Sequence, residues 1–521
     1  MTLTACRRPS TWALFALLLV FHFTFQSMHG AWTSDLAGDP DEAAHAVTSL
    51  MLRDYMAGGW QQSPMLFAKN YYESFPKVAL GHYPPGYYLL AGAWLLPMAS
   101  IKSLFVLQSI LAAAFGTLIY RVASRILPVP AALAAGLLSA ALPFTLKQAE
   151  FVMSDLMLGV LCLLATAAWA DYMQRPTKRR ALGFGLLAAM AILTKGSALA
   201  LCLVPPIATL LTGRWKLIKQ ASWWISALPV AILAGPWMLY SSHITSEGML
   251  HQPLTEYAQE AALFYATSMP HVVGWLLLGF IIVGLALIIR TCVRSPQTST
   301  LLAAGIGMLA GTTAISLFVP TGFSTRYLLP VLPVLLIAAV TAVNAFCSRF
   351  GRGRWPAFYI IMLAAFALTV RWPEKNVTGF SQAVETSGVP QLGTPPTNWL
   401  VAADPRGEGA IIAAAAFHCP QRSPSLLKVY RGTKELSTSD WLGRGYTLAF
   451  PNDSLVLAHL DKLNIRRVFI DLSAEESVRK EHELQLHHAL SNAPDHWTLD
   501  FDQPIVRGPD SAGKLLVYKR L

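Results

Sequence analysis

The chain has 521 residues, of which 54% are hydrophobic and only 13% are charged, and its formal net charge is +11. Soluble domains carry about 25% charged residues, so this composition predicts a membrane protein instead of a soluble one. The positive charge does not favour nucleic acid as a partner, because the basic residues recur at the ends of apolar runs. The 6 cysteines show no CxxC spacing, so neither a cysteine metal site nor a disulfide framework is expected.

Apolar runs that suit membrane spans recur along the first 371 residues, although several fall short of the ~20 residues that a perpendicular span needs. They lie at residues 11–30, 101–120, 131–146, 156–170, 181–194, 197–212, 221–240, 271–289, 300–319, 327–346 and 356–370. Lysine and arginine gather at every second boundary, beginning with Arg7 and Arg8. The positive-inside rule makes these boundaries cytoplasmic. We therefore expect about 11 spans in the inner (plasma) membrane, with a cytoplasmic N-terminus.

The first run is interpreted as an uncleaved span and not as a signal peptide, because no clear small-residue cleavage site follows it. A loop at residues 31–100 then separates the first two spans, and it is far longer than the usual connection of ~4–6 residues. Such a length indicates a functional loop or one with its own structure.

The stretch GDPDEAAHAV (residues 38–47) in this loop predicts the start of a helix. Asp39 is suited to the N-cap, Pro40 to the first helical position and Glu42 to the capping-box partner. Asp41 and His45, one turn apart on a common face, are not needed for this start. Asp41 and His45 are therefore candidates for chemistry.

The helix that follows is predicted to lie flat on the membrane surface, with Arg53 and Asp54 off its apolar side. That side carries Ala44, Val47, Leu50, Met51 and Tyr55. Near the end of the loop, HYPPGYYLLAGAWLLPM (residues 82–98) is apolar but short and bounded by prolines. It predicts an interfacial or re-entrant segment, since counting it as a span would invert every later loop.

Residues 372–521 alternate between strand-like and helix-like segments, which predicts an extracytoplasmic α/β domain with a largely parallel sheet. Strands are expected at 398–404, 425–430, 466–473, 497–501 and 514–520, and helices at 407–417, 454–463 and 474–490. RGEG (residues 406–409) is interpreted as a turn, because it lacks the third glycine of the dinucleotide fingerprint. The expected fold class is a mainly α, polytopic helix bundle (residues 1–371) followed by this α/β domain.

The notable polar residues gather at the predicted outer ends of the spans. They are Asp41, Glu42, His45, His82, Tyr83, Lys147, Glu150, Asp155, Lys195, Arg326 and Tyr327. Carboxylates supply a general base or metal ligands, and cations bind phosphate, so the set favours group transfer from a phosphate-bearing donor. A polytopic lipid or solute transporter with an external binding domain is the alternative, but it would be expected to hold ionisable residues near mid-membrane.

Each candidate also has a structural interpretation. Lys195 can snorkel between two spans, and Arg326 can pair with an acidic neighbour that joins two helices. His82 can belong to an interfacial aromatic belt with Tyr83, and Asp155 is more simply a helix-start carboxylate.

Four motifs in this order resemble the family 39 glycosyltransferases of the GT-C class. They are the early DE pair, PPGYY at the end of the same loop, LTKG between two middle spans, and RYLLPVLP at the start of a late one. The resemblance covers roughly residues 10–370. It implies a GT-C fold and a polyprenyl-phosphate sugar donor used on the external membrane face, with no nucleotide cofactor. The acceptor class, whether lipid, glycan or protein, stays open.

The resemblance also assigns site residues. Asp41 matches the catalytic base or metal-site carboxylate, Glu42 its partner, and Lys195 the lysine that faces the lipid phosphate. His82 stands where the aminoarabinose transferase of lipid A has a glutamate that helps to hold a metal, so this chain departs from that pattern. A divalent metal held by Asp41, His82 and His251, or by His243 in place of His251, is considered on this basis.

The expected reaction is a single inverting displacement. Asp41 would deprotonate or orient the acceptor hydroxyl, while Lys195 and Arg326, with Tyr327 beside them, would neutralise the leaving polyprenyl phosphate.

Overall fold

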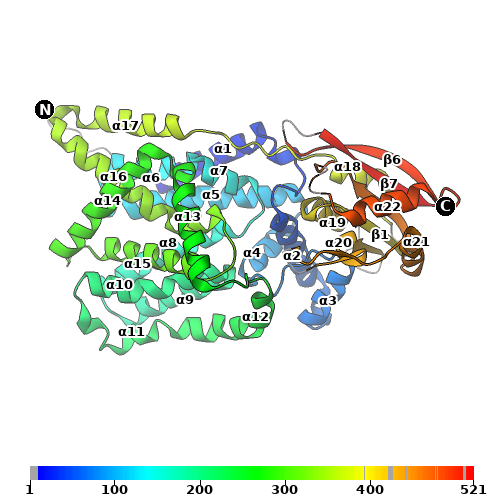
Figure 1. Cartoon of the computed structure of the whole chain (residues 1–521). Helices are drawn as coiled ribbons and strands as arrows, with labels where there is room; N and C mark the ends of the chain where they lie inside the picture. Colours follow the sequence, from blue (N-terminus) through cyan, green and yellow to red (C-terminus); the bar gives the residue numbers. More distant parts are fainter. Residues whose placement is uncertain are drawn as a thin grey trace.

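The computed structural model describes residues 10–296, 299–391, 393–419, 426–439, 443–475, 477, 479–508 and 512–521. Its helices form a bundle, and a C-terminal domain with a β-sheet sits at one end of that bundle (Figure 1). The predicted fold class is therefore confirmed. Arg7 and Arg8, which begin the predicted charge pattern, lie outside the described residues.

Helices or helical turns occupy every apolar run that the sequence marks as a span. The bundle contains α1 (Thr11–Met28), α5 (Ile101–Ala123), α6 (Val129–Ala141), α7 (Pro143–Glu150), α8 (Asp155–Gln174), α9 (Lys178–Thr194), η3 (Gly196–Leu203), α10 (Val204–Leu211), α11 (Ala221–Ile225), η5 (Val230–Ala234), α12 (Gly235–Glu247), α13 (Leu254–Val273), α14 (Trp275–Arg294), α15 (Thr300–Phe318), η6 (Thr325–Val331), α16 (Leu332–Cys347), η7 (Ser348–Gly353) and α17 (Arg354–Thr369).

By length and hydropathy, 7 helices among the described residues are able to cross a membrane, or 8 when the bent pair α6 and α7 is counted as one span. This count is roughly consistent with the expected eleven. One 45-residue segment, Thr325–Thr369, includes two predicted spans, with a non-helical residue at Gly351 between them. The predicted spans at 181–194 and 197–212 correspond to α9, which has 17 residues, and to the shorter apolar segment Gly196–Leu211.

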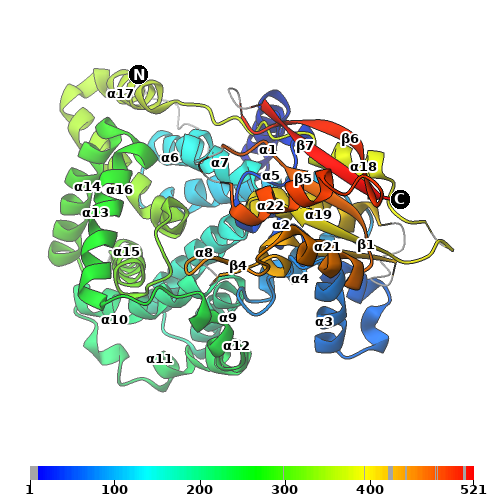
Figure 2. The ribbon, with the colours of Figure 1, turned by 45° about the vertical axis from the view of Figure 1, so that its right-hand side comes forward.

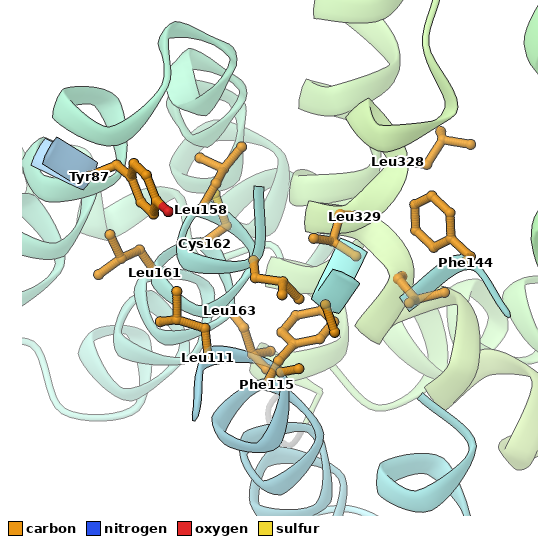
Figure 3. Close-up of a cluster of buried hydrophobic side chains, with 14 of the residues drawn as sticks. Tyr87, Leu111, Phe115, Phe144, Leu158, Leu161, Cys162, Leu163, Leu328 and Leu329 are labelled. Atoms are coloured by element: carbon orange, nitrogen blue, oxygen red, sulfur yellow. The ribbon is translucent and has the colours of Figure 1, made fainter. Parts of the chain in front are cut away.

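A continuous apolar core joins the middle of the bundle. Figure 3 shows a cluster in which Leu111 and Phe115 of α5 lie near Leu158, Leu161 and Cys162 of α8, and in which Leu328 and Leu329 of η6 approach from the other side. This packing holds the N-terminal ends of α8 and η6 close together, and those ends carry Asp155 and Arg326.

The loop at residues 31–100 contains three α-helices, α2 (Pro40–Ala57), α3 (Pro64–Ser74) and α4 (Gly86–Leu95), and two short 3-10 helices, η1 (Ala31–Thr33) and η2 (Gly59–Gln61). At ten residues, α4 is too short to cross a bilayer, as the sequence predicts. It packs directly on α2, because a Cβ added at Gly92 would lie 3.0 Å from the backbone nitrogen of Arg53.

The C-terminal domain contains α18 (Phe380–Ser387), α19 (Pro405–His418), α20 (Gly432–Glu435), α21 (Asp453–Lys462) and α22 (Glu481–Ser491). Its five-stranded sheet has the order β2 (Leu427–Arg431), β1 (Thr397–Ala402), β5 (Ile465–Asp471), β7 (Ala512–Arg520), β6 (Trp497–Val506). A separate two-stranded sheet joins β3 (Ser437–Thr438) to β4 (Thr447–Leu448).

The five-stranded sheet is covered on both faces, as alternating burial requires. Trp399 and Val401 share one apolar core with α18 and α19, whereas Leu400 and Ala402 share the other with α21 and α22. The α19 face lies against α2 of the loop at residues 31–100, so that the two helices are neighbours in both views (Figures 1 and 2).

Three details of the predicted domain differ in the structure. The sheet is parallel only across β2, β1 and β5, because β7 and β6 form an antiparallel hairpin against β5. The helix expected at 474–490 begins at Glu481. RGEG is not a turn but the first turn of α19, which Asp404 caps by accepting from the Gly407 N–H at 3.0 Å.

The surroundings of α2 also differ from the prediction. Arg53 and Asp54 are buried and form an ion pair at 2.7 Å, although the sequence places them off the apolar side of the helix. The C-terminal domain lies against α2, so most of this helix is enclosed by protein, whereas the sequence predicts one side exposed and the other on the membrane.

Candidate active site

The helix start that the sequence predicts at GDPDEAAHAV is present. The Asp39 carboxylate accepts from the Asp41 N–H at 3.0 Å, and Pro40 is the first helical residue. Glu42 accepts from the Gly38 N–H at 3.1 Å, one residue before the capping-box donor that was expected. Asp41 has no capping role, which leaves its carboxylate free for contacts beyond α2.

Asp41 meets Arg326, which is 285 residues away in sequence. The Arg326 Nη2 donates to Asp41 Oδ2 at 2.6 Å, and the Tyr83 hydroxyl donates to the same oxygen at 2.9 Å. Burial is the largest single influence and raises the pKa of Asp41, but the charge and hydrogen bond of Arg326, together with the influence of His45 and the Tyr83 hydroxyl, outweigh it and hold the pKa at about 2. In this arrangement Asp41 is an ionised carboxylate paired with a cation.

Glu42 is completely buried and makes contacts on the opposite side. Its carboxylate pairs with Lys375, which follows the last helix of the bundle, and accepts from the Val152 N–H at 3.2 Å. Lys375 also donates to the carbonyl oxygen of Glu150 at 3.2 Å. Sequence reasoning did not identify Lys375, and only its place directly after the last apolar run signals that it lies at this end of the bundle.

The second predicted cation, Lys195, caps the C-terminal end of α9. Its ammonium donates to Asp155 Oδ1 at 2.7 Å, and Asp155 is the first residue of α8. The same ammonium lies 5.0 Å from the ring centroid of Tyr327 and 5.8 Å from that of Tyr83. Because Tyr83 also bonds Asp41, the two ion pairs belong to one network at the start of α8, the end of α9 and the start of η6.

Several polar atoms in this network have no hydrogen-bond partner among the described residues. They are Asp155 Oδ2, Arg326 Nε, His45 Nε2, Ser154 Oγ and Ser197 Oγ. A buried polar atom without a partner costs roughly 1–3 kcal/mol, so a polar ligand that bonds these atoms would recover that cost.

His45 is fully buried one turn after Asp41. Its Nδ1 lies 2.9 Å from the Tyr88 hydroxyl, and its ring centroid lies 4.7 Å from that of Tyr83. Burial lowers the pKa of His45 to about 4, so the imidazole is neutral at physiological pH. Its position supports the ring of Tyr83 and, through it, Asp41.

The metal ligands considered from the sequence do not come together. His251 is exposed beyond α12, and burial lowers the pKa of His82, which is partly buried. Within the described ranges, no three histidine, cysteine, aspartate or glutamate side chains are grouped in a way that could hold a metal ion. The set Asp41, His82 and His251 therefore does not fit a metal, and no step below depends on one.

The sequence profile of a family described as dolichyl-phosphate-mannose-protein mannosyltransferase matches residues 81–240. This segment contains Tyr83, Asp155 and Lys195. A search of curated proteins gives no match.

Solved structures give a broader likeness. ArnT from Cupriavidus metallidurans, in the apo state and bound to undecaprenyl phosphate, superposes with a TM-score of 0.56 and 15% identity over 98% of both chains. The Archaeoglobus fulgidus oligosaccharyltransferase, solved with zinc and sulfate, gives 0.53 and 12% over 88% of this chain and 67% of that one. AglB from the same organism, solved with an inhibitory peptide and a dolichol-phosphate, gives 0.52 and 12% over 96% and 75%. The chain has the fold of the GT-C glycosyltransferases, and its resemblance to that class is confirmed.

Proposed function

We propose that this protein is a membrane glycosyltransferase that moves a sugar from a polyprenyl-phosphate donor to an acceptor hydroxyl. The observation that carries the proposal is the single network in which Asp41, Arg326, Lys195 and Asp155 meet at one end of the bundle. The profile match and the lipid phosphates bound by ArnT and AglB support it. The acceptor is a hydroxyl of a lipid, a glycan or a protein.

The ion pairs suggest how the donor would activate the site. A phosphate competes with carboxylates for the same guanidinium and ammonium donors. When Arg326 bonds the donor phosphate, Asp41 loses the largest of the influences that lower its pKa, so it becomes a stronger base. Lys195 can exchange Asp155 for the phosphate in the same way.

The transfer is then a single displacement with inversion. The acceptor oxygen attacks the anomeric carbon while the bond from that carbon to the phosphate oxygen breaks. The bonding electrons stay on the phosphate, where Lys195 and Arg326 stabilise the developing charge. The hydroxyl proton goes to Asp41, which acts as the base. A phosphate leaving group needs no protonation, so one base carboxylate is sufficient, unlike the carboxylate pair of glycoside hydrolysis.

The site is proposed to face outward from the inner (plasma) membrane, with the N-terminus in the cytoplasm. The basic residues at alternate boundaries support this orientation. It places the C-terminal domain outside the cytoplasm, and a reporter enzyme fused to the C-terminus checks it. Reporter activity that requires the cytoplasm would contradict the orientation.

Purified full-length protein in lipid nanodiscs, supplied with an undecaprenyl-phosphate sugar and a membrane extract as the source of acceptor, tests the reaction. We expect release of undecaprenyl phosphate only when the extract is present, together with a new glycosylated product. Movement of the sugar lipid across liposomes without any covalent change would instead identify a transporter and overturn the proposal.

A further inference from the structure

A third cation, Lys77, lies where the external loop meets the C-terminal domain. Its ammonium donates to the carbonyl oxygen of Pro405, in the first turn of α19, at 3.0 Å. A Cβ added at Gly409 would lie 3.3 Å from Lys77 Cε and 3.0 Å from the Cβ of Ala43 in the first turn of α2. The segment before α4, the start of α2 and the start of α19 therefore converge at this ammonium.

The carboxylates around Lys77 are already neutralised by arginines. Arg431 Nε donates to Glu408 at 2.8 Å, Arg507 Nη2 to Asp404 at 2.7 Å, and Arg326 Nη2 to Asp41 at 2.6 Å. Glu408, which is fully buried, also accepts two bonds from Thr433. Burial and the charge of Arg431 lower the pKa of Lys77 to about 8, despite the opposing influence of Glu408, Asp41 and Asp404.

Lys77 differs in this respect from the other cations of the region. Within the described part of the chain, Lys195, Arg326, Lys375, Arg431 and Arg507 each pair with a carboxylate, whereas Lys77 contacts a backbone carbonyl and forms no such pair. An ammonium has three donors, so two remain for a ligand. A partly desolvated ammonium with unused donors is suited to an oxyanion.

We propose that Lys77 binds an oxyanion, a phosphate or carboxylate group, carried by the acceptor, and so places the acceptor hydroxyl at Asp41. This inference rests on the proposed function. Lys195 and Arg326 approach Asp41 from the outer ends of the bundle helices, where a lipid-linked donor would lie. Lys77 lies at the contact with the C-terminal domain, the side that is left for the acceptor.

Amine labelling of wild-type protein in nanodiscs tests ligand binding at Lys77 without requiring that a sugar is transferred. Lysines are acetylated at pH 8 and quantified by peptide mass spectrometry, with glycerol 3-phosphate or undecaprenyl phosphate as the probe. At pH 8, a bound anion that raises the pKa of Lys77 from about 8 to about 9 lowers its unprotonated fraction from about one half to about one tenth, so its labelling slows roughly fivefold. We expect glycerol 3-phosphate to slow labelling of Lys77 and to leave Lys428, an exposed lysine near Glu73 at the same interface, unchanged.

Variants test the same contact through ligand-induced stabilisation. The midpoint of thermal unfolding rises with glycerol 3-phosphate concentration according to its dissociation constant. We expect Lys77→Gln to weaken this binding about tenfold, the loss of one charge-assisted hydrogen bond. Lys77→Arg should retain most of the binding, and the matched control Lys428→Gln should match wild type.

Two results would overturn the proposal. One is labelling of Lys77 that glycerol 3-phosphate does not slow, and the other is equal protection by undecaprenyl phosphate, which would assign Lys77 to the donor. A wild-type protein that protects Lys77 but transfers no sugar would contradict the proposed function and leave the oxyanion contact standing.

Discussion

The two sides of the first turn of α2 carry neighbouring carboxylates in opposite surroundings. On one side Asp41, with 24% of its side chain exposed, faces Arg326 and Tyr83 beside several unpartnered polar atoms. On the other side Glu42 is fully enclosed, and Lys375, Gly38 and Val152 occupy both of its oxygens. The pairs are chemically alike, but only the first can exchange its partner for a ligand.

This difference follows from what each cation is attached to. Arg326 lies at the start of η6, and its guanidinium is also 3.5 Å from the Asp39 carboxylate. It therefore stays paired with Asp39 when it releases Asp41. Lys375 belongs to the segment that leads into the C-terminal domain, and its loss would leave the Glu42 carboxyl buried without a counter-ion. The Asp41 side is therefore expected to govern catalysis and the Glu42 side to govern stability.

The largest expected effect is on the Asp41 side. Asp41→Asn removes the proposed base and should lower kcat about 10²–10⁴-fold, the range that general base catalysis supplies. Arg326 retains Asp39, so the thermal midpoint should stay close to that of wild type. Transfer assays with matched unfolding curves check both parts, and full activity in the folded variant would show that Asp41 is not the base.

The corresponding change on the Glu42 side is Lys375→Met. It leaves a buried carboxylate unpaired, at a cost of roughly 3–5 kcal/mol of unfolding free energy. The double variant Glu42→Gln with Lys375→Met removes both charges and should recover much of that loss. Denaturant titration in detergent measures the unfolding free energy of wild type, the single variant and the double variant. A single variant as stable as wild type would show that the enclosed pair does not anchor the domain.

The sequence predicts where α2 begins, but it does not predict which distant side chains pair with the carboxylates of α2. Asp39, Pro40 and the helix start depend on short-range hydrogen bonds, and the apolar runs that become spans depend on length and composition. The partner of Glu42 lies 333 residues away, and nothing in the sequence of either segment specifies that pair. The sequence-based assignment of Glu42 as partner of Asp41 rested on the resemblance alone.

The buried state of Arg53 and Asp54 was missed for a related reason. The periodicity of α2 shows one apolar side, and a charged pair on the other side normally indicates solvent. Here a second domain covers that helix, so packing outweighs the periodicity signal. Helix α13 was also not predicted, because its mixed polar sequence lies in a segment that resembled a loop.

A smaller effect, on the pH dependence of stability, is expected from His45, which lies one turn after Asp41 on α2. The folded-state pKa of His45 is about 4, below the ordinary value of about 6.5, so the native state disfavours the protonated imidazole. Stability is unaffected above pH 6.5 and falls as the pH drops below it, by about 2 kcal/mol at pH 5. His45→Gln should flatten this part of the profile. Equal slopes for both proteins between pH 7 and 5 would show that His45 is not enclosed.

The smallest expected effect is on the third side of the turn, where Ala43 touches the C-terminal domain. In Gly409→Ala the new methyl would lie 3.0 Å from Ala43 Cβ and 3.4 Å from Lys77 Nζ, so α19 must shift by a few tenths of an ångström. Such crowding costs roughly 1–3 kcal/mol, and the contact between two domains can relax toward the lower value. Gly183→Ala in α9, where the added atom meets nothing within 4 Å, is the matched control.

Limited proteolysis of the C-terminal domain in nanodiscs reports the change for Gly409→Ala. We expect the C-terminal domain of this variant to be cleaved faster than that of wild type, whereas Gly183→Ala should be cleaved at the wild-type rate. The shift moves Pro405 and Lys77 relative to Asp41 while both ion pairs of the first turn stay intact, so it should weaken glycerol 3-phosphate binding without lowering the affinity for undecaprenyl phosphate. If the affinities for glycerol 3-phosphate and undecaprenyl phosphate fell together, the domain contact would support the whole site. The acceptor contact at Lys77 would then not be separable from the donor contacts around Asp41.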